Sequence, residues 1–344
     1  MEKIAVLGSG SWGTALAVLL GNKGLPVHIW GRPEDEVSKI RQVRENRRFL
    51  PGVPLPAVVE PTEDLAGALA GARVVVISVP SQAVREIMVR IKPLLNPGVV
   101  LVNTAKGLEV STRLRMSQVV AEVLGEEILQ HYAVLSGPSH AEEVGRGMPT
   151  AVVAASYNKE TAFLIQDMFM AEVFRVYTNP DVAGVELGGA LKNIFALGSG
   201  IAEGLGFGDN PKAALITRGL TEMTRMGAAM GGQKFTFSGL SGLGDLVVTC
   251  SSLHSRNRRA GILIGQGKSL QETLEEIGMV VEGVTTTRVA YGMAHQLNVA
   301  MPITSAAYQI LFCNKDPMEA VWGLMRRKRK HEIEEVVRNT EGWK

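Results

Sequence analysis

Lys192 lies in a segment that combines a helical pattern with many glycines; residues 186–206 read ELGGALKNIFALGSGIAEGLG. A glycine inside a helix costs about 1 kcal/mol relative to alanine, and a chain accepts this cost where something must approach the helix closely. At helical spacing Lys192 is flanked by Gly188, Gly189 and Ala196, so little bulk surrounds its amine. A lysine in such a place can transfer a proton to a substrate. The alternative is tight helix packing, with the amine extended into solvent.

Other polar positions extend this chemistry. Lys106 follows a strand-like run in VLVNTAKG, where it can reach an anion or a carbonyl, or can lie in solvent. Asp245 ends the glycine-rich GLSGLGD, and a lone carboxylate there is suited to pairing with a cation. The segment 249–259, TCSSLHSRNRR, gathers guanidinium groups, hydroxyls and an amide before a helical pattern. A phosphate-bearing ligand requires such groups, although a solvated basic face has the same composition.

The first residues predict a dinucleotide site. An apolar run, KIAVLG, leads into Gly8-Ser9-Gly10-Ser11-Trp12-Gly13 and then into a helical stretch. In a GxGxxG turn the first glycine allows a tight turn, the second lets a pyrophosphate approach the backbone, and the third lets the helix pack on the strand. Gly8, Gly10 and Gly13 therefore predict NAD(P) binding, against the alternative of a purely structural turn.

The end of the second strand bears on the choice between the two nicotinamide cofactors. An Asp or Glu there would bind the ribose 2′-hydroxyl of NAD, but the sequence reads Trp30-Gly31-Arg32. A guanidinium suits a 2′-phosphate. We therefore expect NADP to be preferred and NAD to be accepted; in the alternative, Arg32 covers the adenine or lies in solvent.

Two kinds of domain must position these residues. Up to residue 180, strand-like runs alternate with helical segments, which predicts a doubly wound α/β domain with ligands at the carboxyl ends of its strands. From Asp181 the strand signal largely stops. We therefore expect a Rossmann-type domain over 1–180 and an all-α domain over 181–344, with helices at 186–206, 212–230, 260–267 and 285–295. Ser139, with Glu142 three residues on, is typical of a capping box that begins a helix.

The composition is that of a globular protein. Its 344 residues carry 36 Lys and Arg against 34 Asp and Glu, so a net charge of +2 gives no global attraction to nucleic acid. Cys250 and Cys313 lie far apart without metal-site spacing, so we expect reduced thiols and no metal. With no leader pattern and no apolar run near the roughly 20 residues of a bilayer span, we expect a cytoplasmic protein without an integral membrane segment. The basic run Arg326–Lys330 is typical of a solvated helix face.

Four separated stretches, in order along essentially the whole chain, together resemble the bacterial NAD(P)-dependent glycerol-3-phosphate dehydrogenases. They are GSGSWGTALA, SGPSHAEEV, ELGGALKNIFALGSGIAEGLGFGDNPKAALITRGL and GLSGLGDLVVTCSSLHSRNRRAG. The resemblance implies a Rossmann-type N-terminal domain, an all-helical C-terminal domain like that of 6-phosphogluconate dehydrogenase, and a homodimer. It also implies reversible reduction of dihydroxyacetone phosphate to sn-glycerol 3-phosphate, which supplies the phospholipid backbone.

The resemblance also implies roles for individual residues. Lys192 matches the proton-transfer lysine of the family, with Lys106 and Asp245 beside it in the catalytic group. The residues matched to substrate contacts are Lys106, Gly137, Ser139, Lys192, Asp245, Ser255, Arg256 and Asn257. With the glycines Gly8, Gly10 and Gly13, those matched to cofactor contacts are Ser11, Trp12, Arg32, Lys106, Ala141, Arg256, Val280 and Glu282. Position 140, often aromatic in the family, is histidine here.

This role for Lys192 favours one interpretation of the glycines around it. We expect Gly188 and Gly189 to form a bare floor for nicotinamide and substrate, and the more distant Gly198, Gly200 and Gly204 to serve helix packing. Two other functions remain as alternatives. A β-hydroxyacid-type dehydrogenase would share the two-domain plan but act on a hydroxy acid. A non-catalytic NADP sensor would need no lysine–carboxylate group, so Lys192 and Asp245 argue against it.

Overall fold

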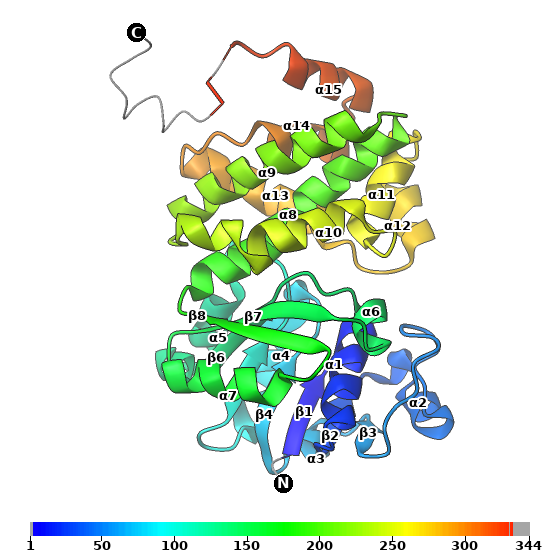
Figure 1. Cartoon of the computed structure of the whole chain (residues 1–344), viewed down its shortest axis with the longest axis vertical. Coiled ribbons are helices and arrows are strands. Elements are labelled where there is room, and N and C mark those ends of the chain that lie inside the picture. Colours follow the sequence, from blue (N-terminus) through cyan, green and yellow to red (C-terminus); the bar gives the residue numbers. More distant parts are fainter. Residues whose placement is uncertain (1–2, 330, 333–344) are drawn as a thin grey trace.

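The chain forms two bodies that are joined by one long helix (Figure 1). The computed structural model describes residues 3–329 and 331–332. Figure 1 shows a sheet with helices on both faces in the lower body and helices alone in the upper body. The predicted α/β and all-α fold classes are therefore confirmed. Lys330, the last residue of the basic run, and residues 333–344 of the predicted second domain lie outside the described residues.

A single sheet of eight strands organises the first body, in the order β3-β2-β1-β4-β5-β6-β7-β8. Neighbouring strands are parallel except β6 and β7, which are antiparallel. The strands are β1 (Lys3–Leu7), β2 (Val27–Trp30), β3 (Val59–Thr62), β4 (Ala72–Ile77), β5 (Val100–Asn103), β6 (Tyr132–Ser136), β7 (Thr150–Ser156) and β8 (Phe174–Asn179). Parallel strands covered on both faces need continuous apolar runs, and the buried VVVI of β4 supplies one.

Helices cover both faces of this sheet because successive strand side chains point to opposite sides. Val74 and Val76 of β4 belong to one apolar cluster, together with residues of α1, α2, α6 and α7. Val75 and Ile77 belong to the other, with residues of α3, α4 and α5. These helices are α1 (Ser11–Asn22), α2 (Val37–Val43), α3 (Leu65–Leu69), α4 (Val84–Ile91), α5 (Met116–Leu124), α6 (Ala141–Gly145) and α7 (Lys159–Phe169).

The predicted capping box at Ser139 is wrong. The N-cap of α6 is His140, which makes no side-chain cap, and the Ser139 hydroxyl donates instead to the Gly137 carbonyl oxygen at 2.9 Å. Gly137 has φ +145°, a conformation that favours glycine, and it turns the chain so that the Ser139 hydroxyl faces back into its own loop. The loop after β6 is therefore held by its own contacts.

The second body consists of helices packed around α8. They are α8 (Val182–Gly204), α9 (Asp209–Ala229), α10 (Asp245–Ser251), α11 (Arg256–Gly265), α12 (Leu270–Ile277), α13 (Glu282–Gln296), α14 (Pro302–Cys313) and α15 (Pro317–Met325). All four predicted helices begin three or four residues before their predicted starts, at Val182, Asp209, Arg256 and Glu282. The first turns of α9 and α11 are polar, so apolar periodicity does not reveal them. None of the helices in the described part of the chain combines the length and apolar character that a membrane span needs.

Helix α8 connects the two bodies and is buried along nearly its whole length. Asp181 caps it by accepting from the Gly184 N–H at 2.8 Å. Val182 and Val185 in its first turn pack into the core of the sheet body. Leu191 and Ile194, further along, pack into the core of the helical body. One continuous helix therefore extends from the edge of the sheet into the helical domain, and Lys192 lies in its middle (Figure 1).

The glycines of α8 are explained mainly by packing. A Cβ on Gly200 would lie 2.0 Å from the Arg258 carbonyl oxygen, and one on Gly204 would lie 2.3 Å from that of Ile262. A Cβ on Gly188 would lie 2.6 Å from the Ser241 carbonyl oxygen. The expectation of a bare floor at Gly188 is therefore wrong, because a neighbouring backbone occupies that space. Packing explains Gly198 poorly, since a Cβ there would meet only the flexible end of Leu215, at 3.4 Å.

Candidate active site

Two lysines and one aspartate meet at the junction of the two bodies. Lys192 Nζ donates to Asp245 Oδ1 at 2.5 Å, and Lys106 Nζ donates to the other carboxylate oxygen at 2.7 Å. Lys192 and Asp245 are buried, whereas Lys106 is partly exposed. The structure thus brings together three residues that are 53 or more positions apart in the sequence.

Each of these side chains is positioned by a different element. Lys106 follows β5, at the carboxyl edge of the sheet, and its amine also donates to the Gly137 carbonyl oxygen at 3.0 Å. Asp245 is the first residue of α10 and follows the glycine-rich turn 240–244. Gly189 of α8 leaves room for Ser136, because a Cβ there would lie 2.8 Å from Ser136 Oγ, whereas Lys106 Cγ, at 3.4 Å, would be in ordinary contact.

Burial and neighbouring charges tune the protonation of this group. Burial lowers the pKa of Lys192 to about 8; repulsion by Lys106 acts in the same direction, and attraction by Asp245 opposes both. Burial also acts to raise the pKa of Asp245, but the two ammonium groups outweigh it and hold that pKa below its usual value. At neutral pH the site therefore holds an ionised carboxylate and a lysine that can give up its proton.

Thr249 and Asn193 belong to this site and were not among the predicted residues. Lys192 Nζ lies 2.7 Å from Thr249 Oγ1 and donates to it. Thr249 follows Asp245 by four residues on α10, so helical spacing alone would have placed it on the same face. Asn193 follows Lys192 directly and donates from Nδ2 to the Lys106 carbonyl oxygen at 3.3 Å.

The predicted phosphate segment lies at the start of α11, close to α8 and α13. Asn257 Nδ2 donates to Asn193 Oδ1 at 2.9 Å, and Asn257 Oδ1 accepts from the Gly283 N–H at 2.8 Å. Arg256 donates to the Val280 carbonyl oxygen at 3.2 Å. Ser255 Oγ caps α11 by accepting from the Arg258 N–H. The basic segment is thus linked by hydrogen bonds to the residue that follows Lys192.

The turn between β1 and α1 fits a dinucleotide. Gly8 has φ +113°, and a Cβ on Gly13 would lie 1.9 Å from the Gly8 carbonyl oxygen, so both positions require glycine. A Cβ on Gly10 would instead project into open space, where a pyrophosphate could approach the backbone. Three buried polar atoms beside this turn have no hydrogen-bond partner among the described residues: Ser9 Oγ, Trp12 Nε1 and Ser78 Oγ. Such atoms suit a polar ligand.

The remaining predicted cofactor residues lie on several elements of the two bodies. Ala141 is buried at the start of α6, and Ser11 begins α1. Glu282, at the start of α13, accepts from the Ser81 N–H at 3.0 Å and from its hydroxyl at 2.7 Å, which links the two bodies. Arg32 directly follows Gly31, which packs against Ser9 of the glycine-rich turn; the Arg32 side chain is largely exposed and donates to Asp35. Ser81 follows β4 at the carboxyl edge, a position at which ligand contacts are expected.

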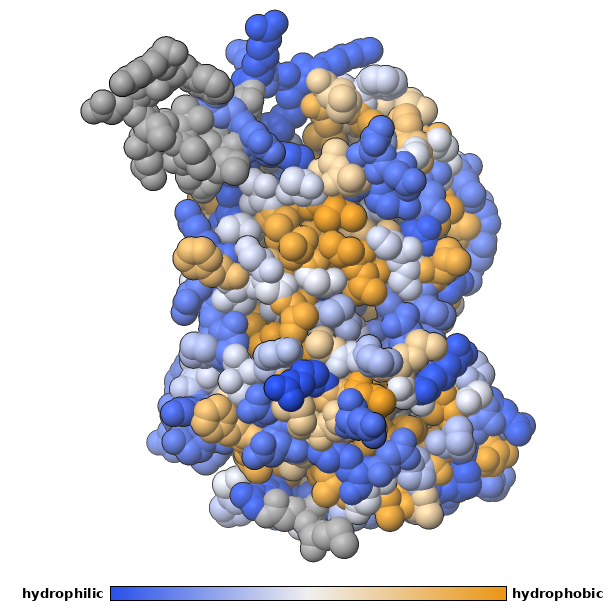
Figure 2. Space-filling model, viewed as in Figure 1, coloured by the Kyte–Doolittle hydropathy of each residue, from blue (hydrophilic) through white to orange (hydrophobic). Residues whose placement is uncertain are grey.

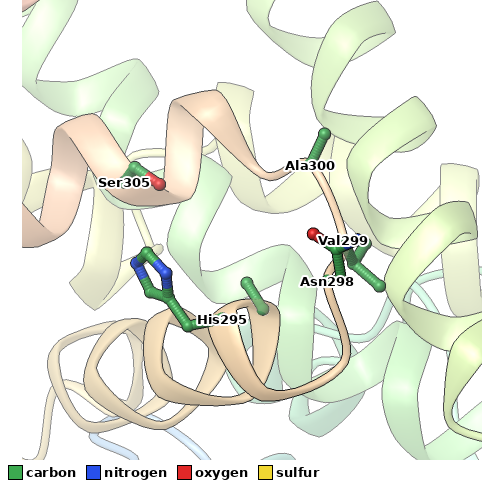
Figure 3. A pocket seen from close by; sticks show the side chains of 6 residues that line it. His295, Asn298, Val299, Ala300 and Ser305 are labelled. Carbon is green, nitrogen blue, oxygen red and sulfur yellow. The ribbon is translucent and has the colours of Figure 1, made fainter.

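A separate hollow of about 200 Å³ lies between the end of α13 and the start of α14 (Figure 3). Its lining includes His295, Asn298 and Ser305. Figure 3 shows His295 and Ser305 on facing helices and Asn298 in the intervening loop. None of the predicted catalytic, substrate or cofactor residues lines this hollow.

Comparison with protein families gives two successive matches. Residues 3–162 match the family described as the N-terminus of NAD-dependent glycerol-3-phosphate dehydrogenase, and residues 181–322 match the corresponding C-terminus. A protein of Syntrophomonas wolfei described as "Glycerol-3-phosphate dehydrogenase [NAD(P)+]" is 62% identical over 343 residues, covering 100% of both chains. A protein of Geobacillus kaustophilus with the same description is 53% identical and covers 98% of both.

Solved structures give the same result. The crystal structure of glycerol-3-phosphate dehydrogenase from Coxiella burnetii superposes with a TM-score of 0.90 at 42% identity, covering 95% of this chain and 99% of that one. The corresponding enzyme of Plasmodium falciparum superposes with a TM-score of 0.86 at 26% identity, covering 96% and 97%. Both domains are therefore shared with these proteins in their relative arrangement.

Proposed function

The chain belongs to the NAD-dependent glycerol-3-phosphate dehydrogenase family, and we propose that Lys192 is the proton-transfer residue of its reaction. The reaction interconverts dihydroxyacetone phosphate and sn-glycerol 3-phosphate. The nicotinamide cofactor supplies or accepts the hydride. The protein must therefore move one proton, stabilise charge on the carbonyl oxygen and hold one phosphate.

The buried group of Lys192, Asp245 and Lys106 carries this proposal. In the reductive direction, Lys192 donates a proton to the carbonyl oxygen as negative charge develops there; in the oxidative direction its neutral amine accepts that proton. The ammonium group also stabilises the developing alkoxide electrostatically. Asp245 and Thr249 orient the amine through the contacts at 2.5 and 2.7 Å. Lys106 contributes a second positive charge beside the substrate.

We propose that Arg256 and Asn257 hold the substrate phosphate, with Gly137, Ser139 and Ser255 as further substrate contacts. Guanidinium and amide groups at the start of a helix favour a phosphate. Binding energy at this remote group helps to position the carbonyl. Arg256→Ala should therefore raise KM for dihydroxyacetone phosphate far more than for unphosphorylated dihydroxyacetone. Equal effects on the two ketones would place the phosphate elsewhere.

The reaction itself is tested by following NADPH oxidation spectrophotometrically with dihydroxyacetone phosphate. We expect rapid turnover with this ketone and none with 2-keto acids that lack a phosphate. Turnover of the keto acids alone would favour a β-hydroxyacid-type dehydrogenase. Replacing Lys192 in the same assay separates the reaction from the role proposed for that residue.

We propose that NADP is the preferred cofactor and that NAD is also used. The cofactor contacts proposed are Gly8, Gly10, Ser11, Trp12, Gly13, Arg32, Lys106, Ala141, Arg256, Val280 and Glu282. Arg32 is exposed and paired with Asp35, so a 2′-phosphate would have to compete with that carboxylate for the guanidinium. Comparing kcat/KM for NADPH and NADH tests the preference, and Arg32→Ala should reduce it. A strong preference for NADH would contradict the proposal.

We propose that the protein acts as a homodimer and that the helical domain begins at Asp181. Figure 2 supports an interface on the helical domain, where apolar side chains gather across the middle of the viewed face. Extended apolar surface of this kind is typical of an interface. Analytical ultracentrifugation tests the proposed dimer directly. The expected result is a single species with twice the chain mass of 36.9 kDa. A monomer at assay concentration would contradict it.

A further inference from the structure

Unpartnered polar atoms are concentrated at the candidate active site. The described part of the chain has eight buried side-chain nitrogen or oxygen atoms without a hydrogen-bond partner. Three lie beside the glycine-rich turn, and two more, Ser136 Oγ and His140 Nε2, lie at and just after the end of β6. An unsatisfied buried polar group is costly, so such an atom beside a ligand site suits a hydrogen bond from the ligand. His140 plays no part in the mechanism proposed above.

His140 lies between the two halves of the proposed substrate site. It belongs to the loop after β6, in which the Gly137 carbonyl oxygen accepts from Lys106. Pro138 of the same loop packs near Gly244, the residue directly before Asp245. On its other side, its ring centroid is 5.9 Å from that of His254, two residues before Arg256. The imidazole thus adjoins both the lysine–aspartate group and the segment proposed to bind phosphate.

The charges around His140 favour its neutral form. Burial lowers the pKa of its imidazole; Lys192 and Lys106 lower it further, while Asp245 and Glu142 oppose them. A neutral imidazole has one donor and one acceptor nitrogen, so it suits a hydroxyl better than a phosphate or a developing alkoxide. Dihydroxyacetone phosphate has one group for which no residue is yet assigned, the free hydroxyl on the carbon beside the carbonyl.

We propose that His140 Nε2 hydrogen-bonds the free hydroxyl of dihydroxyacetone phosphate and selects for ketones that carry it. This inference rests on the proposed position of the carbonyl beside Lys192. A site built to bond a hydroxyl discriminates against an analogue without one, because its own polar atom is then left buried and unpaired. His140 is therefore a specificity-determining residue, and proton transfer by Lys192 does not require it.

The test compares two phosphorylated ketones, dihydroxyacetone phosphate and hydroxyacetone phosphate, in which hydrogen replaces the free hydroxyl. His140→Phe keeps an aromatic ring but removes both nitrogens. We expect it to lower the ratio of the two kcat/KM values roughly tenfold, mainly through dihydroxyacetone phosphate. His140→Gln, which retains hydrogen-bonding atoms, should give an intermediate ratio and serves if the phenylalanine variant does not fold.

Two control variants make the assignment specific. Ser136→Ala removes the other unpartnered atom near Lys106, and His254→Phe replaces the exposed neighbouring imidazole with another ring. Both should keep the wild-type ratio. A His140→Phe ratio within about twofold of wild type, or an equal loss in either control, would overturn the proposal. Lys192→Ala tests the underlying mechanism independently, because it should slow both ketones and leave their ratio unchanged.

Discussion

At the scale of the residue, the surroundings of Lys192 shift the protonation of its amine in opposite directions. Full burial favours the neutral base, Asp245 favours the ammonium acid, and Lys106 again favours the base. The balance lowers its pKa to about 8, where both forms are accessible near neutral pH. The proposed role of Lys192 needs both forms, because the acid would serve reduction and the base would serve oxidation.

Removal of the Lys192 amine should disable proton transfer but leave cofactor binding intact. We expect Lys192→Met, which keeps an unbranched stem, to lower kcat for dihydroxyacetone phosphate about 100- to 10,000-fold. Binding of NADPH should change little. It can be followed by tryptophan fluorescence, because Trp12 lies at the glycine-rich turn. Lys39→Ala, on the exposed part of α2, is the control. A Lys192→Met enzyme with near-normal kcat would remove this residue from the mechanism.

The pKa of Lys192 also predicts opposite pH profiles in the two directions. Reduction requires the ammonium form, so its kcat/KM should fall as pH rises through about 8. Oxidation requires the neutral amine and should rise through the same pH. The substrate phosphate titrates near pH 6, well below this region. Lys106→Met removes a repelling charge and should raise the pKa of Lys192, moving both transitions to higher pH; movement to lower pH would contradict this electrostatic account.

At the scale of the element, the contact of α8 with α11 aligns the lysine with the proposed phosphate segment. Gly200 and Gly204 of α8 face Gly261 and Gly265 of α11, with each Cβ position on α8 occupied by backbone of α11. Because a backbone cannot shift as a side chain can, this contact fixes how closely the two helices approach. Lys192 lies earlier on α8, and Arg256 lies in the first turn of α11.

A single methyl group at this contact should therefore be costly. We expect Gly200→Ala to lower the free energy of unfolding by about 1–3 kcal/mol, because its Cβ would lie 2.0 Å from the Arg258 carbonyl oxygen. Gly198→Ala is a matched control on the same helix, where the new methyl meets only Leu215, and it should stabilise the protein by up to about 1 kcal/mol through helix propensity. Urea denaturation measures both. Equal effects would show that the contact is not tight.

At the scale of the whole molecule, the buried carboxylate of Glu186 and the half-buried one of Glu282 join the two bodies. Glu186, near the start of α8, accepts from Arg115, from the Ser117 N–H and hydroxyl, and from the Tyr132 hydroxyl, each at 2.7 Å. Glu282 makes the second junction through Ser81. These contacts fix the helical domain on the carboxyl edge of the sheet, so Lys192 is held opposite Lys106.

Loss of the Glu186 carboxylate should weaken this junction strongly. We expect Glu186→Ala to lower the free energy of unfolding by about 3–5 kcal/mol, because Arg115 would remain as a buried charge without its partner. Ser117→Ala keeps the backbone donor and should cost only about 1 kcal/mol. Denaturant midpoints measure both, and Glu186→Gln provides a milder variant if the alanine protein does not accumulate. A similar small loss in all three would contradict a structural role for this carboxylate.

Local sequence patterns were sufficient to predict features that depend only on residues near one another in the chain. The GxGxxG turn, the alternating strands and the glycine-flanked lysine are each contained in a short stretch, where backbone conformation and helical spacing follow from residue type. Even within such stretches, a polar first turn concealed the true start of α11, and the conformation of Gly137 redirected the Ser139 hydroxyl away from a cap.

The sequence by itself determined the two domain types and the residues able to carry the chemistry around Lys192. Only the tertiary structure decided which of these residues meet. Gly188 packs on the turn before Asp245, and Asn257 bonds Asn193 from 64 positions away. The guanidinium of Arg32 is paired with Asp35. The physical reason is that contacts between distant segments depend on how whole helices and strands pack, which no local pattern specifies. The flanking glycines of Lys192 thus reflect backbone packing at Gly188 and room for the Ser136 hydroxyl at Gly189.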